Sequence, residues 1–222
     1  MSQDGEHIGD TGQSLDLHQL IASRRSVRGG YSDLDVTQDV IKNILECGLS
    51  APSSKNAQPW KLHVVNDREQ LRSIARAILK AKTAKKYVPQ DPITGEPRDY
   101  DDTVKESAHV LGQVPLGIFV ENDGTFTINR EVVACAPYDT RVGAVFGMGL
   151  EYIGLGACIE NMWLAANSFG LDGVFMGDAV IAEESIREQL EMVGDLVGVL
   201  ALGYSDQSPT PKTMKPERVI WH

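Results

Sequence analysis

The chain has 222 residues, of which 42% are hydrophobic, and a formal net charge of −10. This length and apolar content suffice for a sizeable core, so we expect one folded domain. The acidic balance argues against nucleic acid or anionic membranes as partners, and a local cluster of arginines then suggests a bound anion.

The cysteines and the N-terminal residues carry no secretory signature. Cys47, Cys135 and Cys158 are widely spaced and form no CxxC motif. We therefore expect no disulfide framework, no metal site, and a reducing, cytoplasmic location. Residues 1–13 are polar and acidic, which predicts a disordered lead-in to a single domain spanning residues 14–222.

Hydrophobic periodicity predicts mixed helices and strands. In chain order they are a helix capped by Ser14 and ending near Ser23, a helix capped by Thr37 and closed by Pro52, a strand over 61–65, a helix over 67–86, a strand over 116–121, a long helix from 140 or 141 to 169, a short strand over 174–176, a helix over 183–192 and a strand over 196–204. Without regular βα alternation, this order predicts an α+β fold with a small mixed or antiparallel sheet flanked by helices.

Two segments lack periodicity. Residues 87–102, YVPQDPITGEPRDYDD, contain three prolines and many charges, and they are either a lid over a substrate or a mobile surface insertion. Residues 205–222 contain three further prolines and predict an extended C-terminal arm lying across a surface.

The most apolar stretch of the chain is 142–166. Glu151, Glu160 and Asn161 interrupt it, which favours a buried helix of a soluble protein over a membrane span. Cys47 lies on a predicted helix without an evident basic partner, which favours a core position over a nucleophile.

An arginine cluster, RRSVR, spans Arg24–Arg28 at the end of the first predicted helix. Guanidinium groups bind phosphate oxygens through paired donors, and a serine hydroxyl adds another. The same residues could instead complement the negative end of the helix dipole.

A polar loop, APSSKNAQPW, spans residues 51–60. Ser53, Ser54, Asn56 and Gln58 can both donate and accept hydrogen bonds, as a heteroaromatic ring with carbonyls and ring nitrogens requires, and Trp60 supplies an apolar anchor. The alternative is a connector whose residues serve turn geometry.

Two weaker candidates follow. In Gly170–Asp178, GLDGVFMGD, glycines can bring backbone amides close to a ligand, although ordinary turn geometry would use the same residues. Lys212 and Lys215 in the tail could reach an anion or remain solvated. No GxGxxG dinucleotide motif, GxxxxGK[ST] phosphate loop or HExxH motif occurs.

The four motifs together resemble the nitroreductase superfamily, which comprises FMN-dependent α+β oxidoreductases. The matching segments are IASRRSVR, SAPSSKNAQPWKLHVV, NSFGLDGVFMGD and VGVLALGYSDQSPTPKTMKPERVIW, in the family's order and spacing. The resemblance covers residues 15–222 and is weakest over 81–141. One departure is that Gly29 and Gly30 both precede Tyr31, where the family usually has a single residue.

The resemblance implies an intertwined homodimer with FMN at the interface. One chain would supply the phosphate and ring contacts: Arg24, Arg25, Ser26, Arg28, Met176, Gly177, Lys212 and Lys215. Arg28 would reach the pyrimidine side of the flavin, and the backbone near Met176 and Gly177 would face flavin N5. The other chain would supply Pro52, Ser53, Ser54 and Asn56.

The resemblance also implies an activity. NADH or NADPH would reduce the flavin by hydride transfer to N5, and a small electron-poor acceptor such as a nitroarene or quinone would then be reduced in a ping-pong cycle, with no catalytic side chain and no metal. Two alternatives stay open: flavin-dependent desaturation or dehalogenation, and a flavin-binding protein without turnover.

Overall fold

The computed structural model describes residues 16–85, 93–96 and 103–222 and contains one four-stranded sheet. Its strands are β1 (Trp60–Val65), β2 (Leu116–Asn122), β3 (Asp172–Met176) and β4 (Asp195–Gly203). They are arranged β1-β2-β4-β3, and each neighbouring pair is antiparallel. The predicted α+β class is confirmed, and the sheet is antiparallel rather than mixed.

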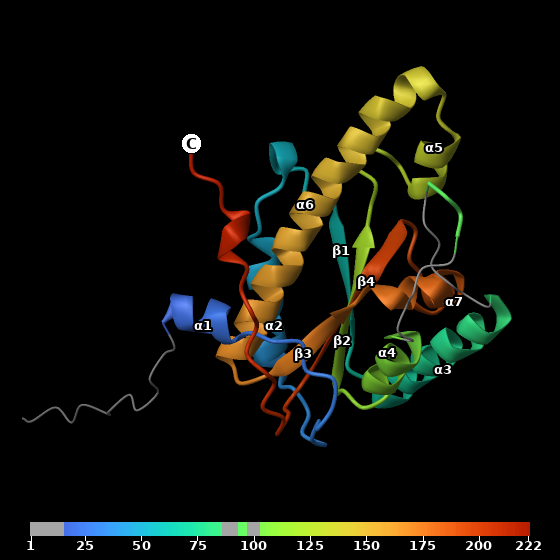
Figure 1. The fold of residues 1–222 in the computed structure, drawn as a ribbon. Coiled ribbons are helices and arrows are strands. Elements are labelled where there is room, and N and C mark those ends of the chain that lie inside the picture. Colours follow the sequence, from blue (N-terminus) through green and yellow to red (C-terminus); the bar gives the residue numbers. More distant parts are fainter. Residues whose placement is uncertain (1–15, 86–92, 97–102) are drawn as a thin grey trace, which may run out of the picture.

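Helices cover both faces of the sheet (Figure 1). The helical segments are α1 (Leu17–Ser23), α2 (Gln38–Leu49), η1 (Ser54–Asn56), α3 (Arg68–Lys85), α4 (Thr103–Leu111), α5 (Arg130–Cys135), α6 (Tyr138–Ser168), η2 (Gly177–Ala182), α7 (Glu183–Leu190) and η3 (Pro216–Arg218). One core joins α2 and α6 to the sheet, and the other joins α3, α4, η2 and α7 to the opposite face.

The central strand β2 shows how the sequence produces these layers. All of its residues are buried. Ile118 and Val120 point into the core beneath α6, whereas Phe119, between them, points into the core beneath α3. Because successive side chains of a strand face opposite sides, a strand covered on both faces is apolar along its whole length.

The predicted elements are largely present. The Thr37 cap is confirmed, since its hydroxyl accepts a hydrogen bond from the backbone N–H of Val40 at 3.4 Å. The helices α4 and α5 were not predicted. Ser14, the lead-in over 1–13 and most of the 87–102 segment lie outside the described residues; within that segment only 93–96 are described, as an exposed turn.

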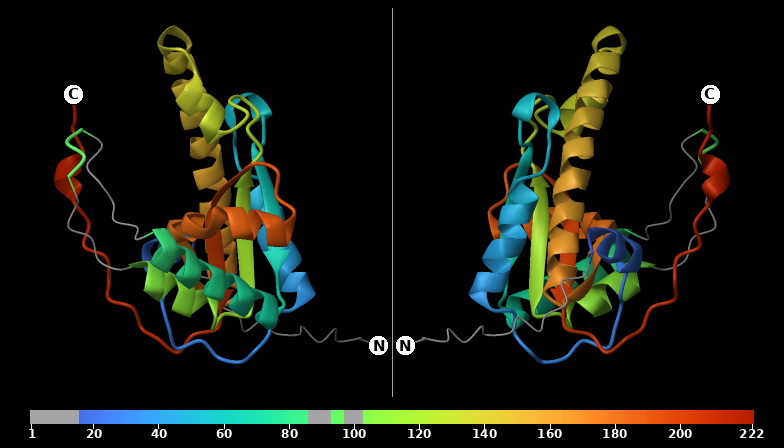
Figure 2. Two further views of the ribbon diagram at one scale, coloured as in Figure 1. Left: turned by 90° about the vertical axis from the view of Figure 1, so that its right-hand side faces the viewer. Right: turned by 90° about the vertical axis from the view of Figure 1, so that its left-hand side faces the viewer.

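The long helix α6 matches the expected buried helix only in part. Its first thirteen residues project past the sheet and are largely exposed (Figure 2), whereas from Glu151 onward the side of the helix that faces the sheet and α2 is buried and other positions such as Ile153 stay exposed. By length and composition alone it could cross a membrane, and 22% of its most apolar stretch is buried.

The expected core position of Cys47 is wrong. Cys47 is exposed on α2, because it lies off the helix face formed by Ile41, Ile44 and Gly48.

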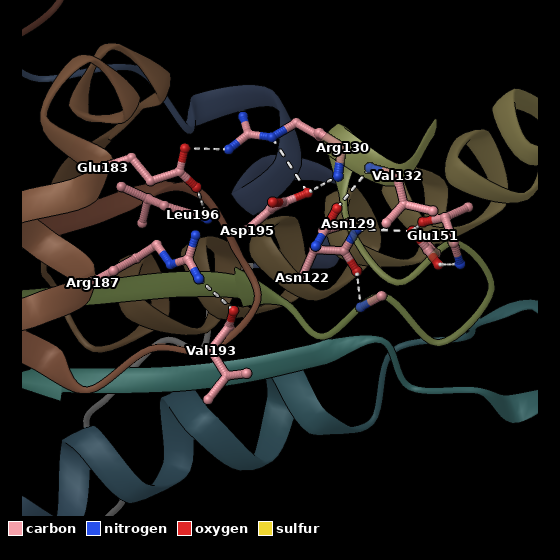
Figure 3. Close-up of polar contacts among 12 residues, drawn as sticks. Asn122, Asn129, Arg130, Val132, Glu151, Glu183, Arg187, Val193, Asp195 and Leu196 are labelled. Atoms are coloured by element: carbon pink, nitrogen blue, oxygen red, sulfur yellow. Dashed lines mark hydrogen bonds and ion pairs between the residues drawn. The ribbon is translucent and has the colours of Figure 1, made fainter. Parts of the chain in front are cut away.

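A polar network anchors the base of the projecting part of α6 (Figure 3). Glu151 is fully buried and accepts hydrogen bonds from the backbone N–H groups of Phe126 and Thr127 at 2.6 and 3.1 Å. It also accepts from the Thr127 hydroxyl at 2.8 Å and from the Asn122 side-chain amide at 2.9 Å. These four donors fix the turn after β2 against α6 and satisfy a carboxylate that would otherwise be costly to bury.

A second part of the network holds α5. Arg130 forms ion pairs with Glu183 at the start of α7 and with Asp195 at the start of β4, and its backbone N–H also donates to Asp195 at 2.7 Å. The α5 helix, which precedes α6 in the chain, is therefore bonded to the ends of two other elements.

Candidate functional site

The arginine cluster runs extended along the edge of the sheet. After α1, Ser26 forms a parallel bridge with Gly173 of β3, and the backbone N–H of Val27 donates to the Gly173 carbonyl at 2.9 Å. Val27 is buried, which fixes the segment in place. Arg24 caps the C-terminus of α1, and Nη1 of Arg25 donates to the Ala22 carbonyl in the last turn of that helix, so the expected helix-end role is also present. Ser26 and Val27 are the residues of the cluster that lie beside β3.

Arg24 is oriented by two residues of α6. Its Nε donates to the Glu160 carboxylate at 2.9 Å, and its guanidinium lies 4.2 Å from the centre of the Trp163 ring, a cation–π arrangement. Its side chain is 19% exposed. Within the described residues, neither Nη atom has a hydrogen-bond acceptor, so this edge of the fork is available to a phosphate.

Arg25 ties the cluster to the tail. Its Nε donates to the Thr210 carbonyl at 3.3 Å, and its Nη1 donates to the carbonyls of Ala22 and Arg24 at 2.7 Å. Among the described residues no carboxylate pairs with Arg25, so its positive charge is uncompensated there. Lys212 follows Thr210 by two residues and is exposed, as is Lys215.

Gly30 explains the departure from the family's usual spacing. Its φ is +67°, and a Cβ there would lie 2.3 Å from the Asp206 carboxylate. The backbone N–H of Asp206 donates to the Gly30 carbonyl at 3.2 Å, and the Ser205 hydroxyl donates to the Gly29 carbonyl at 2.8 Å. The predicted tail contact therefore holds for these first residues and again at Thr210, whereas the arm beyond Thr210 stands away from the body (Figure 2).

Arg28 lies at the other end of the cluster. Its Nε is 3.0 Å from the Glu106 carboxylate of α4. Nearby Tyr31 donates its hydroxyl to the Val27 carbonyl at 2.6 Å. Burial raises the pKa of the Tyr31 phenol well above its usual value, and the Asp172 charge adds to this rise, so the ring remains a neutral donor.

The polar loop has an unusual backbone. Lys55, Asn56 and Gln58 have φ values of 53°, 55° and 48°, which are unfavourable for residues other than glycine. The Ser53 hydroxyl accepts from the Gln58 N–H at 2.9 Å, and the Gln58 amide donates to Asn56 at 3.1 Å, so the loop stabilises itself. Such strained positions concentrate at ligand-binding sites.

The end of β3 is open to a ligand. Met176 is extended, and Gly177 begins η2. A Cβ at Gly177 would have no heavy atom within 4 Å, so the backbone there can be approached closely. The next residue, Asp178, accepts hydrogen bonds from Thr103 at 2.5 Å and Ser107 at 3.3 Å, both of α4.

One chain brings some of these residues together but not all. The Arg24–Arg28 segment, β3 and the start of the tail form one cluster. The polar loop lies elsewhere along α6, with the Ser53 Cβ 3.2 Å from a Cβ built on Gly154, whereas Arg24 stacks on Trp163. Nine residues of helix separate these two contacts by about 13 Å along the axis.

Comparison with known proteins agrees with the fold and these motifs. The Nitroreductase family model matches residues 21–204. Nitrobenzene nitroreductase of Ectopseudomonas oleovorans is 26% identical over 201 residues, covering 86% of this chain and 88% of that protein. A protein of Archaeoglobus fulgidus, named provisionally as an NADH dehydrogenase/NAD(P)H nitroreductase, is 42% identical over 190 residues, covering 84% and 83%.

A solved structure supports the fold. The nitroreductase with bound FMN from Desulfitobacterium hafniense superposes with a TM-score of 0.68 at 18% identity, covering 92% of this chain and 97% of that one. The chain therefore belongs to the nitroreductase family and is an NAD(P)H nitroreductase-family oxidoreductase. Homologues in this family bind FMN and use NAD(P)H.

The described residues fit such a flavin nucleotide. Arg24 has unused donors for a phosphate, Gly177 leaves its backbone approachable, and Asn56 lies in a strained polar loop. In the described parts of the chain no group of three or more His, Cys, Asp or Glu residues could hold a metal ion.

Three residues that shape the site were not predicted from the sequence. Glu160 and Trp163 orient Arg24, and Glu106 pairs with Arg28. A signal for Glu160 was present, because a carboxylate within an apolar helix requires a partner. Glu106 had a weaker signal, the helical spacing of Val104, Ala108 and Leu111 in α4.

Proposed function

We propose that this chain is an FMN-dependent oxidoreductase that uses NADH or NADPH to reduce small electron-poor acceptors such as nitroarenes or quinones. We also propose that it acts as a homodimer whose two chains share each flavin site. The observation that carries the proposal is the separation along α6: the arginine cluster and the polar loop each present unsatisfied or strained polar groups, yet they do not meet within one chain.

The arginine cluster would hold the phosphate end of the cofactor. Arg24 offers its two Nη donors from a position fixed by Glu160 and Trp163, and Arg25 adds uncompensated positive charge. Ser26 adds a hydroxyl, and Lys212 or Lys215 lies on the arm that Arg25 tethers. Paired guanidinium donors and a hydroxyl match the geometry of a phosphate.

The ring of the cofactor would lie between Arg28 and the end of β3. Bound FMN supplies the two-electron chemistry, taking a hydride from NAD(P)H and delivering it to the acceptor. Arg28 places positive charge beside the pyrimidine side, where negative charge grows on reduction. The backbone of Met176 and Gly177 would face the ring, which is supported by the open space beside Gly177, where a Cβ would meet no heavy atom within 4 Å.

An exposed seam on α6 supports the homodimer. The exposed residues Val142, Phe146 and Gly149 of the projecting part and Ile153, just past Glu151, follow a spacing of four, three and four, the spacing of a helix–helix seam. A Cβ at Gly149 would meet nothing within 4 Å in one chain, so another helix can approach closely there. A second copy packed on this seam would bring its own polar loop, which lies at another level of its α6, to the arginine cluster of the first chain.

Spectroscopy tests the activity. The purified protein should be yellow with a flavin spectrum, and NADH or NADPH should bleach it under anaerobic conditions, with colour returning on addition of a nitroarene or quinone. Bound flavin that neither nucleotide reduces would contradict the proposed reductase and favour desaturation or dehalogenation. A colourless protein that takes up no added FMN would contradict flavin binding itself.

Light scattering tests the assembly. The native chain should elute as a dimer without detergent, and Ile153→Glu should give a folded monomer with weakened FMN retention. Heterodimers with Arg24→Ala in one chain and Asn56→Leu in the other should keep one intact site of two. A monomeric native chain, a requirement for detergent, or equal loss at both sites would contradict the shared site.

A further inference from the structure

Helix α4 contacts both sides of the proposed ring site. On one side, Glu106 lies 3.0 Å from the Nε of Arg28. On the other side, Thr103 and Ser107 donate hydrogen bonds to the carboxylate of Asp178, the residue after Gly177. Arg28 and Asp178 are 150 positions apart in sequence, and the first two turns of α4 join them.

The position of Glu106 is fixed by its own helix. Val104, Ala108 and Leu111 of α4 are buried in the core formed with α3, and Ser107 is 7% exposed. These contacts hold the backbone at Glu106 against the core formed with α3. The Glu106 carboxylate is therefore presented to Arg28 from a rigid element.

The pair contributes little to stability. The side chains of Arg28 and Glu106 are 46% and 49% exposed, and water and salt screen ion pairs this exposed. Their exposure has a different consequence, because a ligand beside Arg28 can reach the pair and compete for the guanidinium.

We propose that Glu106 is a positioning and charge-balancing residue for the flavin site, and that it lowers the preference of the protein for reduced over oxidised FMN by partly neutralising Arg28. This inference rests on the proposed function, in which Arg28 faces the pyrimidine side. Thr103 and Ser107 serve the same site by holding α4 to Asp178, which fixes the separation of Arg28 and the Gly177 backbone.

The sign follows from the charges. Reduced FMN bound as an anion carries one more negative charge at its pyrimidine side than oxidised FMN does, so Arg28 stabilises the reduced form. The Glu106 carboxylate opposes this stabilisation by its own negative charge and by holding Arg28. In Glu106→Gln the side chain keeps its length and an oxygen that can accept from Arg28, but the charge is lost.

The test measures FMN affinity in both oxidation states. Apoprotein is titrated with oxidised FMN by fluorescence quenching, and the midpoint potential of the bound flavin is measured with a reference dye. We expect Glu106→Gln to increase the preference for reduced FMN about tenfold, a rise in midpoint potential of about 30 mV for a two-electron couple. Glu106→Asp, which restores the charge, should return the potential toward the native value.

Two controls separate charge from structure. Glu188→Gln removes an exposed carboxylate of α7 that has no ion pair among the described residues, and it should leave the potential unchanged. In an Arg28→Gln background, Glu106→Gln should change the preference about threefold or less, because its partner is gone. Thermal unfolding should be similar in all these variants.

The outcomes are distinct. A native protein that binds no FMN overturns the proposed function together with this inference. A native protein that binds FMN, with the potential of Glu106→Gln unchanged, lowered or matched by Glu188→Gln, overturns the role of Glu106 alone. An equal effect of Glu106→Gln with and without Arg28 also overturns it, because the carboxylate would then not act through that arginine.

Discussion

The exposed seam and the buried side of α6 are both apolar but have opposite environments. Ile153 is 72% exposed, whereas Ile159, less than two turns later on the same helix, is 8% exposed. Leu155, Cys158 and Met162 are fully buried, in contrast to Phe146 at 68% exposure. The comparison shows that apolar residues of one helix can be buried or exposed. Contact with the sheet and α2 decides which residues of α6 belong to the core.

The residue at the boundary carries the largest expected effect. Glu151→Leu removes the acceptor for four donors from Asn122, Phe126 and Thr127. Buried donors left without acceptors are costly, so we expect a loss of about 3–5 kcal/mol in the free energy of unfolding. Urea denaturation measures it. A loss below about 1 kcal/mol would mean that the turn after β2 does not depend on this anchor.

A matched pair of isoleucines compares the exposed seam and the buried side of α6 directly. Ile159→Ala should lower the free energy of unfolding by about 2–4 kcal/mol, because it leaves a cavity in the core beneath α6. Ile153→Ala should weaken dimer association, measured by dilution in light scattering, while the fold of the chain remains as judged by circular dichroism. Equal losses of unfolding free energy and no change in association would remove the distinction between the two parts.

The buried part of α6 also supports the proposed phosphate contact. Arg24→Ala removes a guanidinium held by Glu160 and Trp163, and we expect FMN affinity to fall by roughly 1.5–3 kcal/mol with little effect on folding. Isothermal titration of apoprotein with FMN measures this. Arg76→Ala, an exposed arginine of α3 paired with Glu69, is the control. Equal FMN binding by both variants would argue against the phosphate assignment.

The smallest effect concerns the sheet face opposite α6. Glu121 of β2 is buried, and although burial alone would raise its pKa, hydrogen bonds from the Gly194 N–H and His63, with the charge of Lys61, hold the pKa below its usual value. A lowered folded pKa means that this stabilisation is present above the unfolded pKa, about 4.3, and is lost as pH falls through the folded pKa.

Thermal unfolding between pH 7 and 3 measures that effect. Stability should fall below about pH 4.3, and Glu121→Gln, which cannot ionise, should be less stable at pH 7 and show a shallower decline. A parallel decline in the native chain and Glu121→Gln would assign the acid sensitivity to other carboxylates.

Much of the fold was predictable from local pattern. The β1, β2 and β4 boundaries were predicted to within a residue or two, because β2 and β4 are nearly continuous apolar runs and β1 alternates between apolar and polar residues. The helices α4 and α5 were missed because they have nine and six residues, too few turns for a clear period, and they lie in the part of the chain with the weakest family resemblance.

The candidate site was predictable as residue types and not as an arrangement. RRSVR and APSSKNAQPW indicate phosphate and ring contacts because guanidinium, hydroxyl and amide groups have specific hydrogen-bonding geometries. The carboxylates that oppose two of these arginines, Glu160 and Glu106, come from helices far away in sequence, and local spacing carries no information about such pairs.

The sequence by itself determined the strands, the long helix and the residues able to bind a flavin nucleotide. These depend on the periodicity of the side chains and on their functional groups. The tertiary structure decided that α6 is divided at Glu151, that Arg24 stacks on Trp163, and that the polar loop is about 13 Å farther along the helix. The physical reason is that burial and long-range pairing depend on which elements meet in space, and the periodicity of one helix is the same on both sides of that boundary.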